Sequence, residues 1–411
     1  MVSSYETQSG TMDRKLHICH VITRMIIGGA QENTLLTVKG LAQRGHEVTL
    51  ITGPTTGPEG KLLDQVETSA VEIVEEPTLV RPLNLLQDAR AWSALEQYFK
   101  LRGFDVIHTH SSKAGVLGRI AGRRAACPLV VHTVHGQPFH PYERWWKNRL
   151  YIAAERFAAR RCDRIYAVCQ AMIEQCVEAG IASADMYQVV YSGMEQEPFI
   201  NARPCEQLRD ELGIPAGVPV IGKVARLSEL KGHSFLLDAA PAIVEAFPDV
   251  RFLLVGDGNL REDLEERVKR AGLEKNVVFA GLISPAAIPR YFALMDILVH
   301  LSLREGLPRS VVQGFAAGLP AVTFNLDGAP EVVHPGETGY LCEPKNSLDV
   351  KEALLDLLKN PAKAREMGRN GCEYVQSRFD WRKMVEAIEG SYYRELAKKI
   401  APSSCEHRGD L

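Results

Sequence analysis

The feature that most constrains this chain is a repeated alternation of short apolar runs with longer segments of helical periodicity. Parallel strands that are buried on both faces give continuous apolar runs, and each needs a helix-sized connection to the next. In the first half such runs lie at 17–22, 47–51, 105–108, 129–133 and 164–168. The alternation restarts with runs at 219–225, 251–255, 277–280, 297–300 and 320–324. The pattern predicts an α/β protein with two doubly wound parallel sheets.

Breaks in this periodicity predict the domain boundaries. The chain has 411 residues, which exceeds a single ordinary core, and the pattern is interrupted near 190–204 by Ser192, Gly193 and Pro198. Helical patterns at 349–358, 362–377 and 381–400 follow the second set of runs. We therefore expect a frayed or disordered N-terminus at 1–14, a first domain at 15–200, a second domain at 201–378, a C-terminal helix at 379–400 and a polar tail at 401–411.

Composition excludes several classes of protein. A net charge of −3 gives no general attraction to nucleic acid, so no nucleic-acid partner is expected. No apolar stretch reaches the roughly 18 residues of a membrane-spanning helix, and the first residues are too polar for a secretory signal. Nine cysteines without a Cys-x-x-Cys pair are typical of reduced thiols. These features predict a cytoplasmic protein.

Two loops of the second half carry groups that suit a sugar attached to a diphosphate. Arg226 and Lys231 follow one predicted strand, and Glu305 lies in the loop after another. Two cations can neutralise a diphosphate, and a loop carboxylate can accept hydrogen bonds from sugar hydroxyls. Beyond Glu305, the ring of Pro308 presets a helical turn whose leading amides can bind an anion. A solvated arginine and lysine are the alternative, but Gly232, which opens a helix beside them, favours a binding site.

Glycine turns after other strands are weaker signals. Gly28 and Gly29 follow the first strand and open the first helix, so a phosphate or ligand oxygen can approach their bare backbone. Gly256 and Gly258 end a second-domain strand in a similar turn. A plain tight turn is the alternative for both pairs, and the first lacks the full G-x-G-x-x-G. Ligands of doubly wound sheets bind at the carboxyl ends of the strands, which here predicts a cleft between the domains.

Histidines gather at predicted strand ends in the first domain. His108 and His110 alternate onto one face, and His132 and His135 flank the next strand. A metal site is one interpretation, but no carboxylate or thiolate stands at ligand spacing, so no metal is expected. His135, followed by Gly136, lies where the first domain should meet the ligand, and its imidazole can hydrogen-bond a transferred sugar or a phosphate.

The absence of any Asp-x-Asp sequence bears on how a diphosphate is neutralised. Enzymes that bind a nucleotide diphosphate through a divalent ion commonly need such paired carboxylates. Arg226 and Lys231 would then have to neutralise the leaving group themselves. The sequence therefore predicts a reaction that is independent of metal ions.

The segment 143–161 combines aromatic side chains, an apolar stripe and many cations. Trp145, Trp146, Lys147 and Arg149 form a candidate contact with an anionic membrane surface. The alternative is an ordinary amphipathic helix packed on the sheet, with arginine stems covering apolar surface. Two adjacent tryptophans cannot both face inward, and both interpretations stay open.

The order and spacing of these motifs resemble the retaining glycosyltransferases of family 4, which have the GT-B architecture of two Rossmann-like domains facing a central cleft. The resemblance covers roughly 15–381 and implies that the last helix crosses back onto the first domain. It rests on Gly28-Gly29, His108-Thr-His110-Ser-Ser-Lys-Ala-Gly, His135-Gly136, Tyr191-Ser-Gly-Met-Glu195, Arg226 with Lys231-Gly232, Gly256-Asp257-Gly258, Glu305-Gly306, Gly318-Leu-Pro320 and Ala329-Pro-Glu331-Val-Val.

Together the residues and the resemblance give a set of expected roles. The catalytic candidates are His135, Arg226, Lys231 and Glu305. The donor-binding candidates are Gly29, Arg226, Lys231, Gly256, Gly258, Glu305, Gly306, Leu307, Pro308 and Gln313. The acceptor-side candidates are Gly28, Gly29, His110 and His135.

One position departs from the family pattern. The signature has two glutamates separated by seven residues, and the second, which accepts hydrogen bonds from ribose hydroxyls, is Gln313 here. An amide oxygen can accept one such bond but forfeits its charge-assisted part, which is worth roughly 1 kcal/mol. Weaker donor affinity is expected, and a non-catalytic nucleotide-sugar-binding protein becomes an alternative.

The expected activity is transfer of a hexose-type sugar from a nucleotide diphosphate sugar, with UDP as the favoured nucleotide, to a hydroxyl acceptor with retention of configuration. The setting is cell-surface polysaccharide or glycolipid synthesis. The nucleotide sugar is the donor substrate and no cofactor is expected. The expected acceptor is a glycan or a lipid-linked glycan. If it is lipid-linked, we expect the protein to contact the anionic inner face of the cell membrane. A GT-B epimerase or hydrolase of nucleotide sugars is a further alternative. A nicotinamide-dependent dehydrogenase is disfavoured, since G-x-G-x-x-G with its later acidic residue is missing.

Overall fold

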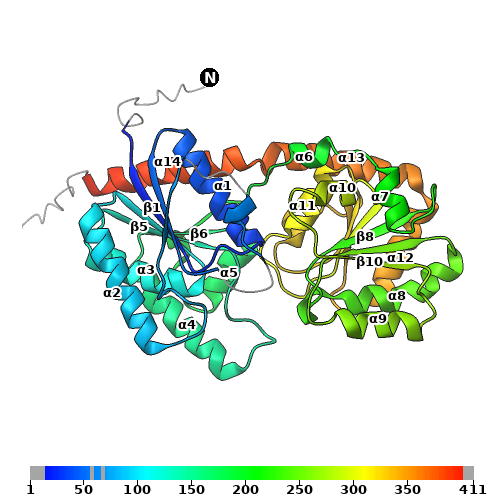
Figure 1. Cartoon of the computed structure of the whole chain (residues 1–411), viewed down its shortest axis with the longest axis horizontal. Helices are drawn as coiled ribbons and strands as arrows, with labels where there is room; N and C mark the ends of the chain where they lie inside the picture. Colours follow the sequence, from blue (N-terminus) through cyan, green and yellow to red (C-terminus); the bar gives the residue numbers. More distant parts are fainter. Residues whose placement is uncertain (1–13, 56–59, 66–69, 401–411) are drawn as a thin grey trace, which may run out of the picture. The chain divides into compact units, whose positions relative to one another are not determined.

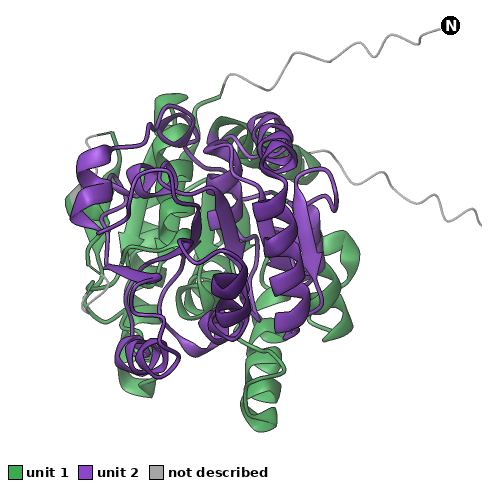
Figure 2. Cartoon of the chain, turned by 90° about the vertical axis from the view of Figure 1, so that its right-hand side faces the viewer, with its two compact units in different colours: residues 1–167, 173–190, 382–411 green, residues 168–172, 191–381 purple. Residues whose placement is uncertain are grey.

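The computed structural model describes residues 14–55, 60–65 and 70–400, and Figure 1 shows their helices and strands. The chain forms two compact units, coloured separately in Figure 2. The first comprises 1–167, 173–190 and 382–411, and the second comprises 168–172 and 191–381. Of the terminal segments expected to be frayed, 1–13 and 401–411 lie outside the described residues.

The first unit is built on a parallel sheet of seven strands in the order β3-β2-β1-β4-β5-β6-β7. The strands are β1 (His17–Ile22), β2 (Glu47–Thr52), β3 (Glu72–Glu75), β4 (Val106–His110), β5 (Leu129–Val134), β6 (Arg164–Ala167) and β7 (Tyr187–Val189). The apolar runs predict β1, β2, β4, β5 and β6. The edge strands β3 and β7 escape that prediction because they are short and largely half-exposed.

Helices cover both faces of this sheet. They are α1 (Gly29–Gln43), α2 (Leu85–Arg102), α3 (Ser112–Arg124), α4 (Trp145–Ala159), α5 (Gln170–Glu178) and α14 (Trp381–Ile400). On one face, Leu95 and Phe99 of α2 pack in a cluster with Ile107 of β4. Helix α2 starts cleanly because Asn84 caps its first amides, and it ends at Gly103 in the left-handed conformation.

The last helix, α14, packs within the first unit on the other face. Tyr392 is fully buried, and its hydroxyl lies 2.5 Å from Nδ1 of His108. Glu389 is 2.6 Å from Arg44 and 2.7 Å from Nε2 of His46. Residues that end the chain therefore complete the unit that begins it.

The second unit holds a parallel sheet of six strands in the order β10-β9-β8-β11-β12-β13. The strands are β8 (Val220–Val224), β9 (Arg251–Val255), β10 (Val277–Gly281), β11 (Ile297–His300), β12 (Ala321–Phe324) and β13 (Gly339–Cys342). The helices are α6 (Glu197–Ile200), α7 (Glu206–Glu211), α8 (His233–Ala246), α9 (Arg261–Arg270), α10 (Ile288–Phe292), α11 (Arg309–Ala316), α12 (Ser347–Lys359) and α13 (Pro361–Arg378). Both sheets are parallel and doubly wound, which confirms the predicted fold class.

The boundary between the units lies ten residues earlier than the expected 200/201, after Val190. The reason is local packing in the second unit. Phe199 of α6 meets Phe292 of α10 edge to face, with ring centroids 5.3 Å apart. Residues 168–172 also belong to this unit, where the Glu331 carboxylate accepts hydrogen bonds from the amides of Gln170 and Ala171.

Two further sequence predictions concern thiols and membranes. The cysteines within the described part of the chain are all free thiols. Among the helices that the structure describes, none has both the length and the apolar character needed to cross a bilayer.

Candidate active site

In the second unit, three loops leave the carboxyl ends of β8, β9 and β11 and are hydrogen-bonded to one another. The amide of Leu227 donates to Asp257 O at 3.0 Å, which joins the first two loops. The amide of Leu303 donates to Leu230 O at 2.8 Å, which joins the first and third. The predicted donor-binding residues lie on these loops and in the turn and helix that follow the third, at the edge where parallel sheets bind ligands. Gly29 is the exception, since it lies on α1 of the first unit.

Two glycines permit the close approach of these loops. Gly232 has φ +67°, and a Cβ there would lie 1.9 Å from Leu301 O. Gly256 has φ +134°, and a Cβ there would lie 2.2 Å from Ala225 O. Any side chain at either position would collide with backbone and adopt a strained conformation. The loop geometry around Lys231 therefore depends on glycine.

Lys231 and Glu305, 74 residues apart in sequence, form an ion pair with Nζ 2.5 Å from Oε1. Nε2 of His300 lies 3.4 Å from the same oxygen. Burial alone would raise the pKa of Glu305, but the charge of Lys231 and the interaction with His300 outweigh it and hold that pKa below its ordinary value. The carboxylate is therefore ionised at neutral pH and can accept hydrogen bonds.

The backbone at Glu305 is also held in place. Its amide donates to Oδ2 of Asp327 at 2.8 Å, and Asp327 itself sits in a turn with φ +52°. Neither Asp327 nor His300 was singled out from the sequence. His300 ends β11 and Asp327 lies in a separate turn, and polar groups contributed by separate segments carry no periodic signal that would mark them as neighbours.

The remaining donor-side candidates occupy the same loops with different exposure. Arg226 is exposed, and within the described residues its side chain makes no hydrogen bond or ion pair. Gln313 is half-buried on α11, likewise without a side-chain hydrogen bond to a described residue. Gly306, Leu307 and Pro308 are buried, and Gly256 and Gly258 are half-buried. Pro308 caps α11, whose first residue is Arg309, so the proline stands one position earlier than a first-turn residue.

Lys223 is a buried cation that the sequence analysis missed. It lies on β8 with 1% exposure, and its Nζ has no hydrogen-bond partner among the described residues. Burial and the nearby charge of Lys231 lower the pKa of Lys223 to about 7, against the opposing influence of Glu305. The signal was present in the sequence, since a lysine inside a predicted buried strand needs an explanation.

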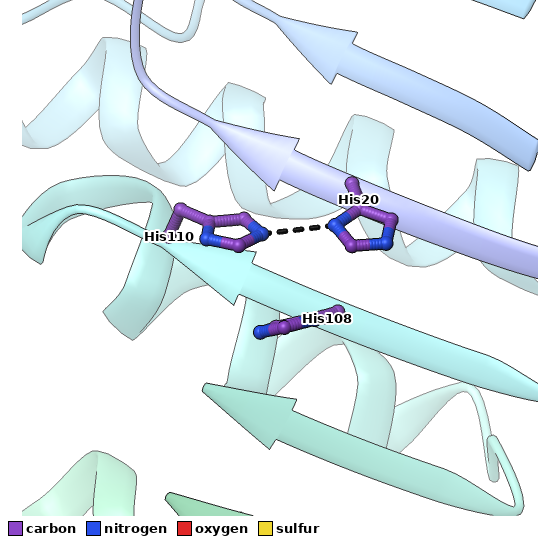
Figure 3. Close-up of side chains that lie close together, drawn as sticks. All are labelled: His20, His108 and His110. Atoms are coloured by element: carbon purple, nitrogen blue, oxygen red, sulfur yellow. Dashed lines mark hydrogen bonds between the residues drawn. The ribbon is translucent and has the colours of Figure 1, made fainter. Parts of the chain in front are cut away.

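The first unit brings three histidines together on the neighbouring strands β1 and β4 (Figure 3), and of these only His110 ends its strand. Nδ1 of His20 lies 2.9 Å from Nε2 of His110, and the rings of His108 and His110 stack with centroids 4.3 Å apart. The prediction that His108 and His110 share a face is confirmed. His20 was missed because it comes from another strand, where it is the register partner of His108.

These three side chains offer ring nitrogens within 4.8 Å of one another, a spacing that raises the question of a metal. Both nitrogens of His108 are already engaged, by Tyr392 Oη at 2.5 Å and Thr133 Oγ1 at 2.6 Å. The facing nitrogens of His20 and His110 stand at hydrogen-bonding distance. A hydrogen-bonded stack accounts for these contacts, so the expectation of no metal remains our prediction.

The other acceptor-side candidates lie in the same unit. His135 is half-buried just after β5, and its Nε2 is 3.0 Å from Nδ1 of His110. His132 lies inside β5 rather than at its flank, buried against Thr109 Oγ1 at 2.9 Å. Gly29 is the first residue of α1, and Gly28 precedes it.

The membrane candidates lie at the start of α4. Trp145 is 71% exposed and Trp146 is 47% exposed, so neither ring is part of the core. Arg149 is exposed, whereas Lys147 is half-buried and 3.3 Å from Glu143. Both rings therefore lie at the surface of the first unit.

Comparison with known proteins matches both halves of the chain. The family described as Glycosyl transferases group 1 matches residues 205–374, and Glycosyltransferase Family 4 matches residues 27–197. The UDP-Gal:alpha-D-GlcNAc-diphosphoundecaprenol alpha-1,3-galactosyltransferase of Escherichia coli is 30% identical over 389 residues, which covers 94% of this chain and 98% of that protein. Spore coat protein SA of Bacillus subtilis is 27% identical over 380 residues, covering 89% and 94% respectively.

A solved structure matches the chain over a similar extent. The crystal structure of Anabaena Alr3699/HepE in complex with UDP-glucose superposes with a TM-score of 0.75 at 25% identity, covering 92% of this chain and 99% of that one. With the sequence matches to both halves, this likeness fixes the family and the general activity. The chain belongs to the family 4 glycosyltransferases of GT-B fold and is itself a glycosyltransferase.

Proposed function

We propose that the protein transfers a hexose-type sugar from a UDP-linked donor to a hydroxyl acceptor with retention of anomeric configuration. The observation that carries the proposal is the contact between Lys231 and Glu305 at the carboxyl edge of the second sheet. It puts a cation that suits a phosphate beside an ionised carboxylate that suits a sugar hydroxyl. Support for UDP comes from the Escherichia coli relative, named for UDP-Gal, and from the neighbour bound to UDP-glucose.

Each part of the donor contacts the protein groups whose charge and hydrogen-bonding capacity suit it. The diphosphate pairs with Lys231 and with the exposed Arg226, and backbone amides near Leu307 add hydrogen bonds. Glu305 accepts from the sugar hydroxyls, and Gln313 accepts one bond from the ribose through its amide oxygen. Gly256 and Gly258 leave the backbone bare where the nucleotide approaches.

Transfer needs no protein nucleophile. The bond from the anomeric carbon to the phosphate oxygen breaks, and the acceptor oxygen bonds to that carbon on the same face. The acceptor proton passes to an oxygen of the departing diphosphate, so charge and protons balance. Lys231 and Arg226 stabilise the charge that develops there, and no divalent ion is required. In the first unit, His135 hydrogen-bonds the transferred sugar or a phosphate, while Gly28 and Gly29 line the acceptor side. His110, expected there from the sequence, is buried and contacts His135 instead.

For the acceptor we propose a lipid-linked glycan, used in cell-surface polysaccharide or glycolipid synthesis. The Escherichia coli relative is named for a diphosphoundecaprenol acceptor. The exposed pair Trp145 and Trp146 stands beside cations at the start of α4, which suits an anionic bilayer at the inner face of the cell membrane.

The proposed function is tested by measuring thermal stabilisation with a panel of nucleotide sugars, followed by product analysis with an undecaprenyl-diphosphate-linked GlcNAc acceptor. We expect a UDP-hexose to raise the melting temperature selectively and to be turned over at an equal rate with excess chelator. Strict dependence on Mn²⁺ or Mg²⁺ would contradict the roles of Arg226 and Lys231. Release of free sugar or an epimer without acceptor would favour the hydrolase or epimerase alternative.

Replacing Gln313 with Glu should tighten donor binding. A carboxylate restores a charge-assisted bond to a ribose hydroxyl, and a gain of roughly 1 kcal/mol corresponds to a KM for the UDP-sugar about fivefold lower. Gln376→Glu, an exposed change of the same chemistry on α13, is the matched control. If Gln313→Glu leaves KM unchanged, Gln313 does not contact the ribose.

Replacing both Trp145 and Trp146 with Ser should weaken binding to vesicles that contain phosphatidylglycerol. Removing two exposed aromatic rings from an interface should lower the partition coefficient roughly tenfold or more. Leu348→Ser alters an exposed apolar side chain on α12 of the other unit and serves as the control. Equal binding of the Trp variant and the wild type in a sedimentation assay would mean that α4 is an ordinary surface helix without a role at the membrane.

A further inference from the structure

A row of three imidazoles runs from the interior of the first unit to His135. Nδ1 of His20 faces Nε2 of His110 at 2.9 Å, and Nδ1 of His110 faces Nε2 of His135 at 3.0 Å. Figure 3 shows the first of these contacts as a dashed line between neighbouring strands, with His108 alongside. His20 and His110 are almost wholly buried, whereas His135 is half-buried.

The two buried rings are neutral. Burial lowers the pKa of His20 to about 3, and burial together with the neighbouring histidines holds the pKa of His110 well below its ordinary value. A neutral imidazole has one N–H and one bare nitrogen. His110, which faces a ring nitrogen on each side, must therefore donate through one nitrogen and accept through the other.

The described titratable groups nearest to His20 and His110 do not supply a charge. His108 on β4 and His132 on β5 have a pKa held well below the ordinary value, in both cases mainly by burial. Tyr166 on β6 and Tyr392 on α14 have a pKa raised by burial. All four are neutral at physiological pH, so hydrogen bonding decides how the row is arranged.

The buried end of the row, at His20, determines which ring donates and which accepts in each hydrogen bond. Nε2 of His20 is buried and has no hydrogen-bond partner among the described residues. A buried N–H without an acceptor is more costly than a buried bare nitrogen, which puts the hydrogen of His20 on Nδ1. His20 then donates to Nε2 of His110, and His110 donates from Nδ1 to Nε2 of His135.

We propose that His110 is a positioning residue that fixes the hydrogen of His135 on Nδ1, which makes Nδ1 the hydrogen-bond donor of that ring. Protonating Nε2 of His135 would reverse both hydrogen bonds. It would leave His20 with a buried N–H that has no acceptor among the described residues. Histidine in water prefers its hydrogen on Nε2, so the opposite tautomer at His135 is a signature of the row. The inference deepens the proposed function, in which His135 contacts the transferred sugar or a phosphate, because a ring with its hydrogen on Nδ1 cannot act as a base at that nitrogen.

The test is NMR of the full chain labelled with ¹³C and ¹⁵N in histidine, with no donor or acceptor present. His135 is assigned by its loss in His135→Gln. We expect His135 to show the Nδ1–H tautomer. A wild-type His135 that carries its hydrogen on Nε2 would overturn the proposal without the need for any further variant.

Two variants separate positioning from simple packing. His110→Leu should shift His135 toward the Nε2–H tautomer, with a loss in kcat of roughly tenfold or more. His20→Phe should leave the tautomer of His135 unchanged, because the bare buried nitrogen merely moves to His110. If the tautomer of His135 is the same in His110→Leu as in the wild type, the proposal is contradicted. Absence of transfer activity in the wild type would count against the proposed function alone, since the NMR result does not depend on turnover.

Discussion

Lys231→Ala should lower kcat for sugar transfer by about a thousandfold or more while the protein remains folded. The lysine pairs with Glu305 at 2.5 Å and is the cation placed to neutralise the leaving diphosphate. Its removal leaves that developing charge to Arg226 and the backbone amides near Leu307. Steady-state kinetics with the UDP-sugar identified in the donor screen provide the measurement. Lys359→Ala, which deletes an exposed lysine at the end of α12, controls for the change in net charge.

Loss of activity must be separated from loss of stability, because Lys231→Ala also leaves the Glu305 carboxylate without its partner. The double variant Lys231→Met with Glu305→Gln removes both charges and should unfold at nearly the wild-type temperature. It should be as inactive as the single variant. Kinetics of Lys231→Ala that match those of the wild type would remove Lys231 from the donor site, and restored activity in the double variant would show that an unpaired Glu305 caused the defect.

Lys223→Met should stabilise the protein, and more at pH 6 than at pH 9. The pKa of Lys223 is lowered to about 7 in the folded state, whereas the unfolded chain restores an ordinary lysine. Between these two pKa values the unfolded state binds more protons, so the lysine's cost to folding is full below pH 7 and declines as the pH rises. At pH 6 the gain should be on the order of 2–4 kcal/mol in the free energy of unfolding.

The measurement is urea unfolding of wild type and variant across this pH range, with Lys359→Met as the matched surface control. Methionine has a similar length and fills the same space without a charge. A variant that is less stable than the wild type at pH 6 would mean that the Lys223 ammonium is satisfied in the fold. A gain of equal size at both pH values would assign the effect to packing rather than to the charge.

The sequence predicts the central strands of both sheets because these are buried on both faces and give unbroken apolar runs. It misses β3, where glutamates stand at both ends of four residues, and it also misses β7 and β13. All three are edge strands, and their sequences are too short or too exposed to give a pattern. The order of strands follows from the doubly wound rule rather than from any local signal.

The proximity of Lys231 and Glu305 could be anticipated because each follows a strand that ends at the same edge of one sheet. Lys223 and His20 could not be placed in the same way. Both interrupt apolar strands, and the alternation of side chains does not reveal which polar atoms from neighbouring strands and loops surround them. The sequence therefore predicts roles for the charged loop residues. The positions of the buried polar side chains near them could be found only from the structure.

The position of α14 has a consequence for dissecting the protein. A fragment ending near residue 190 would retain every strand of the first sheet but lose the helix that provides His108 with Tyr392 and His46 with Glu389. Deleting the final twenty or so residues of the described chain would expose the same apolar surface and invite aggregation of an otherwise intact N-terminal half. Recombinant production of that half on its own calls for a circularly permuted or spliced gene in which 382–400 is tethered back to it.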